Sequence, residues 1–461
     1  MKNREQYKRL IKFIASAFLI AIQTGIFYLV WFNFYDLSGA QFFVRCNYVI
    51  VAQYALLFFC FNKLYGGFKI GYLRIFEILF SQILAVLCVN AITYLQLCLI
   101  GNALLSPVPM AKLFGIQILV AVVLILMYTT LYHKLYAPHN MLLIFGSRNS
   151  VGLKFKMDSR KDKYNITGLI SADEGYEAII HKIPKYDAVI LNDVAAPLRN
   201  DILKFCYRYR VRTYVAPKLT DIMIRGAKII SLFDTPLLLV KGTGLTPAQR
   251  VGKRLMDIVL CSIAMIVAAP VMAVVAVAIK LEDGGPVFFK QKRMTRGGRE
   301  FDILKFRSMI VDAEKYAGAV LATDNDPRIT KVGKVIRATR LDEIPQILNI
   351  LKGDMSIVGP RPERKVIADE YYKEIPEFAY RLKVRGGLTG YAQIYGKYNT
   401  SAYDKLRLDL MYIENYSLLM DIKLIILTLR IIFSKESTEG IDKQQENQRK
   451  IEELLREMEE E

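Results

Sequence analysis

The chain has 461 residues, of which 53% are hydrophobic, and its formal net charge is +19. A mean hydropathy of +0.24 is too high for an ordinary soluble protein, and the length allows several domains, so we expect membrane spans. The positive charge does not indicate a nucleic-acid partner, because no recognised nucleic-acid-binding motif accompanies it and the basic residues are tied to apolar segments.

Four apolar stretches in the first part of the chain predict transmembrane helices. They cover residues 10–34, 48–61, 75–100 and 113–132, and the second is short for a full span. The first stretch is too long for the apolar core of a signal peptide and lacks a small-residue cleavage site, so we expect it to be retained. The sequence therefore predicts a four-helix transmembrane domain over residues 1–138.

Basic residues predict how this domain is oriented. Five of them, Lys2, Arg4, Lys8, Arg9 and Lys12, precede the first span, and three more, Lys63, Lys69 and Arg74, lie between the second and third. The other two loops contain only Arg45 and Lys112. Because positively charged loops stay in the cytoplasm, the chain after Lys134 is expected to begin there. The six cysteines lie in or beside apolar runs or alone, and we expect buried thiols without chemistry.

Residues 139–240 are predicted to form a Rossmann-like α/β domain. An apolar strand that begins at Met141 runs into the sequence GSRNSVG, and further strands are expected at 187–191 and 211–215. Gly146 and Gly152 do not have the G-x-G-x-x-G spacing, and no acidic ribose-binding residue follows the second strand. We therefore favour a vestigial or regulatory fold that serves assembly over a functional dinucleotide site.

A linker at 241–252 leads into a second membrane-associated region. The apolar run 258–279 is long enough to cross a bilayer, but crossing would carry the rest of the chain to the far side. Pro270, in the middle of the run, removes a backbone hydrogen bond and bends the helix. We predict a re-entrant helix over 254–281 that is broken at Pro270 and has both ends at the cytoplasmic face. A kinked fifth span is the alternative.

Charged residues flank this run on both sides. Lys253, Arg254 and Asp257 precede it, and we expect them to anchor the helix at the membrane interface. Residues 280–340 contain 14 Lys and Arg against 8 Asp and Glu. A basic domain next to a membrane attracts anionic headgroups.

Two adjacent carboxylates form the centre of the candidate site. Asp342 and Glu343 come just before Pro345, and apolar residues then continue at helical spacing. Acidic residues and proline are both favoured at a helix N-terminus, so a simple helix start is one interpretation. A phosphate or nucleotide site is the other.

Basic residues around the two carboxylates support the second interpretation. Lys334, Arg337, Arg340 and Arg361 surround them, a ring that would suit a diphosphate. Arg361 lies between two prolines that restrict its backbone, and a guanidinium matches phosphate oxygens with a planar fork of donors. The residues by themselves leave both interpretations open.

Several motifs occur in order along the second half of the chain. They are KRLMD at 253–257, GGPVFFKQKR at 284–293, FDILKFRSM at 301–309, DPRITKVGKVIR at 326–337, and then RLDEIPQ, GDMSIVGPRP and GLTGYAQI. Together they resemble the bacterial polyprenyl-phosphate sugar-phosphate transferases, also called monotopic phosphoglycosyl transferases. The resemblance covers residues 253–434 and implies a mostly helical catalytic domain at 253–437. The N-terminal part resembles the long-form members, which carry four membrane helices and a nucleotide-fold domain.

The resemblance implies an activity. The protein would transfer a sugar 1-phosphate from a UDP-sugar to polyprenyl (undecaprenyl) phosphate and release UMP, the initiating step of exopolysaccharide, capsule or O-antigen synthesis. Asp342 would be the nucleophile that forms an aspartyl phosphosugar intermediate, and Asp342 and Glu343 would hold Mg²⁺. The phosphate-binding residues implied are Arg361, Arg337, Arg340, Lys305 and Arg307.

The resemblance also implies a location and partners. The protein would lie in the bacterial inner membrane as a multi-pass protein with its catalytic domain on the cytoplasmic face, and would supply downstream glycosyltransferases. A homodimer is left open. The alternatives are a membrane-tethered nucleotide-sugar dehydratase or epimerase and a noncatalytic polysaccharide-assembly scaffold. The charged tail at 438–461 is expected to be a helix without a catalytic role.

Overall fold

The computed structural model describes residues 7–35, 44–147, 151–232, 234–311, 326–396 and 400–432. The chain divides into two compact units, Met1–Tyr214 and Val215–Glu461, which are treated separately below. The helix predicted at 438–461 lies outside the described residues.

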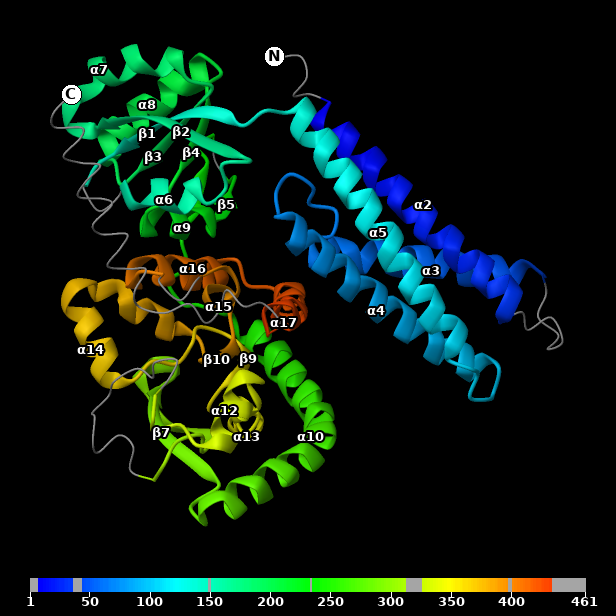
Figure 1. Cartoon of the computed structure of the whole chain (residues 1–461). Helices are drawn as coiled ribbons and strands as arrows, with labels where there is room; N and C mark the ends of the chain where they lie inside the picture. The colour runs from blue at the N-terminus through cyan, green and yellow to red at the C-terminus, as the bar shows by residue number, and fades with distance from the viewer. Residues whose placement is uncertain are drawn as a thin grey trace. The chain divides into compact units, whose positions relative to one another are not determined.

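Long apolar helices open the first unit (Figure 1). In the described ranges they are α2 Lys8–Phe34, α3 Val44–Tyr65, α4 Ile75–Ile100 and α5 Val108–Leu135. Each is long and apolar enough to cross a membrane. The pairs α2–α3, α3–α4, α4–α5 and α2–α5 pack together, which closes a bundle around a core that includes Phe27, Trp31 and Phe58. The prediction of several apolar helices at the N-terminus is confirmed.

A polar network crosses the bundle core, with one residue from each helix. Gln117 Nε2 donates to Tyr54 OH at 2.8 Å, and Asn90 Nδ2 donates to Gln117 Oε1 at 3.0 Å. Tyr54 OH donates to Asn90 Oδ1, and Gln23 Nε2 donates to the Gln117 carbonyl. All four residues are at least 97% buried, so these hydrogen bonds specify how the four helices meet.

An α/β sheet completes the first unit. Its strands among the described residues are β1 His139–Phe145, β2 Tyr164–Ser171, β3 Ala188–Asn192 and β4 Arg212–Val215, in the order β2-β1-β3-β4. β1 pairs in parallel with β2 and β3, and the helices are α6 Gly152–Asp158, α7 Gly175–Lys182 and α8 Ala196–Arg208. Both sheet faces are buried, since Leu142 and Ile144 enter one hydrophobic cluster and Met141 and Leu143 another. The mixed α/β content is confirmed.

Gly146 follows β1 at the predicted glycine turn. A Cβ at this position would collide with the carbonyl oxygen of Asp193, which follows β3. Close approach of two backbone segments therefore accounts for this glycine without a ligand.

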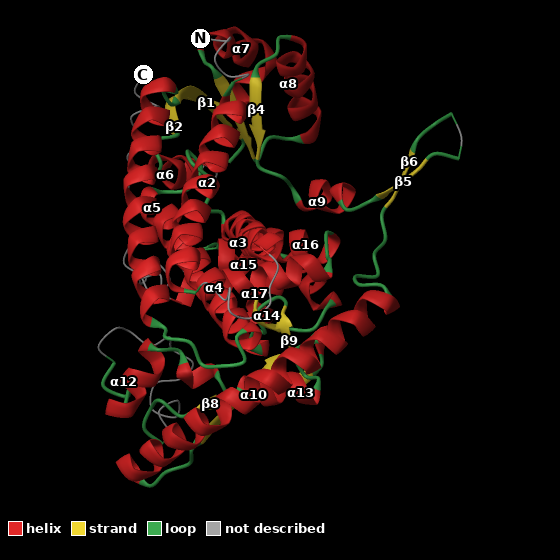
Figure 2. Cartoon of the chain, turned by 90° about the vertical axis from the view of Figure 1, so that its right-hand side faces the viewer, coloured by secondary structure: helices red, strands yellow, loops and turns green. Residues whose placement is uncertain are grey.

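The second unit combines helices with short sheets. Its helices in the described residues are α9 Leu219–Arg225, α10 Pro247–Asp283, α12 Lys331–Ala338, α13 Gln346–Lys352, α14 Lys365–Glu374, α15 Tyr391–Tyr395, α16 Ala402–Glu414 and α17 Leu418–Ile432. The strand pairs are β5 Lys228–Ile230 with β6 Leu237–Leu239, β7 Phe288–Met294 with β8 Glu300–Phe306, and β9 Ser356–Val358 with β10 Gly387–Thr389. The β5–β6 hairpin projects away from the rest of the unit (Figure 2).

The main core of this unit starts earlier than the predicted domain boundary at 240. Leu219 and Ile222 of α9 pack with Leu406 and Leu410 of α16. The division between the compact units accordingly falls at Tyr214.

Helix α10 is continuous for 37 residues and contains Pro270. It curves along α13 and β9 (Figure 1). The helix therefore continues through Pro270, where the sequence predicted a break. Many apolar residues of α10 are exposed, including Ile266 at 77% and Val274 at 70%.

Candidate active site

Asp342 and Glu343 lie in a short 3-10 turn, Leu341–Glu343, between α12 and α13. Arg340 enters the turn in the left-handed conformation with φ 56°, and Pro345 caps the following helix α13. The two carboxylates therefore lie just before α13, close to the helix N-terminus at which the sequence placed them. The tight turn projects two adjacent carboxylates from one short segment.

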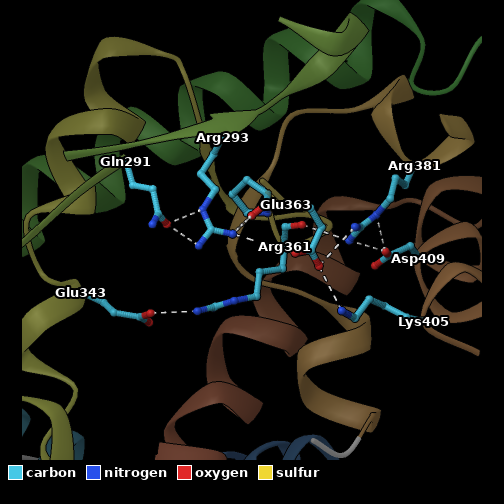
Figure 3. Close-up of polar contacts among 9 residues, drawn as sticks. Gln291, Arg293, Glu343, Arg361, Glu363, Arg381, Lys405 and Asp409 are labelled. Atoms are coloured by element: carbon cyan, nitrogen blue, oxygen red, sulfur yellow. Dashed lines mark hydrogen bonds and ion pairs between the residues drawn. The ribbon is translucent and has the colours of Figure 1, made fainter. Parts of the chain in front are cut away.

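Glu343 forms ion pairs with two cations. Its Oε1 lies 2.7 Å from Lys305 Nζ on β8. The same oxygen lies 3.0 Å from Arg361 Nη2 (Figure 3). Burial favours the neutral acid, but the charges of Arg361 and Lys305 outweigh it and hold the pKa of Glu343 below its ordinary value. Glu343 is a charged group that keeps two cations beside Asp342.

Asp342 has a different environment. Its closest cation is Lys305, whose Nζ is 3.8 Å from Oδ2, and its side chain is 14% exposed. Burial raises the pKa of Asp342 above its ordinary value; Lys305 and Arg337 oppose the shift, and Glu343 adds to it. Neighbouring carboxylates whose pKa values are pushed apart are typical of functional sites.

A buried network holds the loop that carries Arg361 (Figure 3). Arg381 Nη2 donates to the Arg361 carbonyl oxygen at 3.0 Å and pairs with Asp409 Oδ2 at 2.8 Å. Glu363 accepts from Lys405 at 3.0 Å and lies 3.5 Å from Arg381 Nη1. Arg381 and Asp409 are 3% and 1% exposed. This network fixes the backbone from which the Arg361 side chain reaches Glu343, and sequence reasoning missed it.

The other predicted phosphate-binding residues differ in placement. Arg337, at the end of α12, is exposed and acts on Asp342 through its charge, and Arg340 is exposed at the start of the turn. Arg307 is not brought to Asp342 or Glu343. Its guanidinium pairs with both oxygens of Asp283, and its Nε donates to the Pro286 carbonyl at 2.7 Å. Arg307 therefore closes the connection between α10 and β7, and its phosphate-binding role stays a prediction.

Lys253, Arg254 and Asp257, which were predicted to be interfacial anchors, contact other parts of the catalytic unit. Lys253 Nζ lies 2.6 Å from Asp421 Oδ2, and Asp257 accepts from Ser356 Oγ at 2.7 Å. Arg254 donates to two carbonyl oxygens at the end of α13. Lys253 and Asp257 are buried, so these residues fasten α10 to the domain interior.

The metal prediction depends on the same two carboxylates. The described residues contain no group of three or more His, Cys, Asp or Glu side chains that could hold a metal ion. Mg²⁺ is commonly held by one or two carboxylates together with substrate phosphates and water. Asp342 and Glu343 fit that donor set, because carboxylate oxygens are the hard donors that Mg²⁺ prefers. The contacts of Lys305 and Arg361 with Glu343 both go to Oε1.

Comparisons with known proteins match the part of the chain that contains these residues. A family model described as bacterial sugar transferase matches residues 248–435. One relative is the UDP-N-acetylgalactosamine-undecaprenyl-phosphate N-acetylgalactosaminephosphotransferase of Aeromonas hydrophila. The chain is 40% identical to it over 263 residues, and this match covers 54% of this chain and 61% of that protein.

Two further relatives are named UDP-glucose:undecaprenyl-phosphate glucose-1-phosphate transferase. The Escherichia coli protein is 40% identical over 211 residues, 45% of this chain and 44% of that protein. The Caulobacter vibrioides protein is 39% identical over 211 residues, 44% of this chain and 79% of that protein. The chain thus spans about half the length of the Aeromonas and Escherichia relatives.

Proposed function

The chain belongs to the bacterial sugar transferase family, and on that premise we propose that it transfers a sugar 1-phosphate from a UDP-sugar to undecaprenyl phosphate. The products are undecaprenyl diphosphate sugar and UMP, and the reaction would start exopolysaccharide, capsule or O-antigen synthesis. The observation that carries the proposal is the Asp342–Glu343 pair with Lys305 and Arg361 around it.

Asp342 is the nucleophile in this proposal. Its carboxylate attacks the sugar-bearing phosphorus, the bond from that phosphorus to the bridging oxygen of the diphosphate breaks, and UMP leaves. A phosphate oxygen of undecaprenyl phosphate then attacks the aspartyl phosphosugar and releases the Asp342 carboxylate. Lys305 and Arg361 offset the repulsion between the carboxylate and the anionic diphosphate.

We further propose that Asp342 and Glu343 hold Mg²⁺ together with substrate oxygens. The ion would neutralise charge on the diphosphate. Glu343 would retain its ion pairs with Lys305 and Arg361 through Oε1.

The proposed topology places α2–α5 across the inner membrane and the catalytic domain on the cytoplasmic face. Contacts at both ends of α10 support a re-entrant course. Near its start, Lys253 pairs with Asp421; near its end, Asp283 pairs with Arg307, and Ile279 packs on Phe306. All of these partners belong to one compact unit, and a helix that crossed the bilayer could not keep both sets of contacts with a domain on one side.

We propose that the α/β sheet of the first unit is a Rossmann-like domain that serves assembly. The order β2-β1-β3-β4 and the parallel pairing support this interpretation. Close backbone packing at Gly146 is consistent with a structural role.

The deciding experiment measures UMP release by the full chain with undecaprenyl phosphate and a panel of UDP-sugars. Asp342→Asn should abolish release, because the amide is nearly isosteric but is not a nucleophile. Asp302→Asn is the matched control, since Asp302 is an exposed carboxylate on β8. UMP release by Asp342→Asn at the control rate would refute the assignment. Conversion of the UDP-sugar without the acceptor would instead indicate a dehydratase or epimerase, and no turnover with any donor would favour a scaffold.

A further inference from the structure

A second basic region of the catalytic unit forms a cleft of about 600 Å³, a volume typical of ligand sites. Its walls come from four separate segments: α10, the β7–β8 turn, the end of α13 and the segment that leads into β10. The charged residues that line it are Arg254, Arg296, Arg299, Lys352, Asp354 and Arg385. Five cations and one carboxylate give the lining a formal charge of +4.

The contacts inside the cleft leave most of this charge unbalanced. Arg299 and Lys352 share the carboxylate of Asp354, at 2.9 and 3.4 Å. Arg254 donates to the carbonyl oxygens of Ile350 and Leu351, which carry no net charge. The single carboxylate is therefore already shared between two of the cations.

Arg296 and Arg385 have no carboxylate partner within the described part of the chain. Burial lowers the pKa of Arg385 below its ordinary value. The positive charge of Arg254 adds to this shift, and the carboxylate of Asp257 opposes it. A guanidinium that is half-buried among like charges is stabilised when an anion binds. The cleft therefore has the electrostatics of an anion site.

This cleft is separate from the candidate active site. Asp342 and Glu343 precede α13, while Asp354 follows it, and a seven-residue helix is about 10 Å long. Arg299 directly precedes β8, and Lys305 lies six residues further along, about 20 Å in an extended strand. An anion bound by Arg296 and Arg385 is thus a different one from the phosphate attacked by Asp342.

The cleft opens next to the apolar face of α10. Val251 and Leu255 flank Arg254 along this helix and are 69% and 63% exposed, and the apolar run begins at Ile258. A polar surface and an apolar surface therefore meet at this cleft, as they do where a protein lies at the edge of a bilayer. An anionic headgroup at that depth would face the cleft while its acyl chains followed α10.

We propose that this cleft binds a phosphate group, carried by an anionic phospholipid headgroup or by a soluble phosphate ester. Arg296 and Arg385 supply the charge-assisted hydrogen bonds, and Arg254, Arg299 and Lys352 supply the surrounding positive field. The site does not depend on the transfer reaction proposed above.

The test uses the full chain, purified in a neutral detergent and stripped of lipid. Native mass spectrometry measures the apparent Kd for phosphatidylglycerol, with phosphatidylcholine as the zwitterionic comparison and glycerol 3-phosphate as the soluble one. The variants are Arg296→Gln, the double variant Arg296→Gln/Arg385→Gln and the control Arg225→Gln. Arg225 is exposed in the same compact unit and lies outside the cleft, so its replacement removes an equal charge.

Loss of one charge-assisted hydrogen bond weakens binding by roughly tenfold. We expect Arg296→Gln to raise the Kd for phosphatidylglycerol about tenfold, the double variant to raise it further, and Arg225→Gln to leave it unchanged. Arg296 is exposed on a turn, so its single variant remains informative if the double variant does not fold.

The outcomes separate the two sources of phosphate. An effect of the variants on phosphatidylglycerol but not on glycerol 3-phosphate assigns a lipid headgroup. An effect on glycerol 3-phosphate without any lipid preference assigns a soluble phosphate ester. Equal Kd values for the unmodified chain, Arg296→Gln and Arg225→Gln with both ligands would overturn the proposal.

Discussion

Replacing Lys253 by methionine should destabilise the catalytic unit, because it would leave Asp421 charged and unpaired in the interior. Lys253 Nζ is 2.6 Å from Asp421 Oδ2, and the two side chains are 8% and 0% exposed. Removing one partner of a buried ion pair costs about 3–5 kcal/mol. For a unit of this size the loss corresponds to a fall in Tm of about 6–20 °C.

A double-mutant cycle separates this explanation from a membrane-surface role. Lys253→Met/Asp421→Leu removes both charges, and Tyr412, which donates to Asp421 at 2.8 Å, retains the Val358 carbonyl as a partner. Replacing a buried pair by apolar residues is often close to neutral, so most of the lost Tm should return.

The assay is thermal unfolding of the purified full chain in detergent. Lys352→Met serves as the control, because the Lys352 side chain is 77% exposed. If Lys253→Met and Lys352→Met lowered Tm equally, by the small amount expected for an exposed charge, the interior role of Lys253 would be refuted.

Arg361→Lys should lower kcat/KM for the UDP-sugar about tenfold or more, since a lysine cannot reproduce the planar fork of donors; unchanged donor kinetics would contradict phosphate binding by Arg361. Burial raises the pKa of Asp342, and the charge of Lys305 opposes this shift. Activity should therefore be lost as the pH falls through a pKa above that of an ordinary aspartate, because protonated Asp342 is not a nucleophile. Lys305→Met should raise this pKa and move the loss of activity to higher pH. A pH–rate profile that does not shift would exclude Lys305 from that role. A cysteine at Leu281, introduced into a cysteine-free chain, should react with an impermeant maleimide only from the cytoplasmic side. Pro270→Leu should shift part of the population to a membrane-spanning form, with loss of activity. Labelling of the Pro270 protein from the outside would refute the re-entrant course. Chelation of Mg²⁺ should stop UMP release, which would return when the ion is restored.

Local patterns in the sequence predicted the features that depend on neighbouring residues. Hydropathy located the apolar helices, including α10, and the motif around Asp342 and Glu343 identified the pair that Lys305 and Arg361 contact. Strand β2 was missed because Gly168 interrupts its apolar pattern; a Cβ there would collide with the Tyr186 hydroxyl.

Long-range ion pairs could not be predicted in the same way. Lys253 and Asp421 are separated by 168 residues, and nothing in either local sequence identifies the other as its partner. The family resemblance implied phosphate binding by Arg307, but Arg307 lies after the end of β8 and its ion pair with Asp283 joins positions 24 residues apart. The packing of the domain sends Arg307 to Asp283.

The polar network of the helical bundle has a consequence for membrane insertion. Gln117 on α5 bonds to groups on the other three helices, and Asn90 and Tyr54 depend on it in return. A helix that entered the lipid by itself would bring an amide or hydroxyl without its partners into hydrocarbon, where such groups are costly. The insertion machinery should therefore release the four helices together. A helix that entered the membrane before the others would remain exposed to membrane quality control until they packed against it.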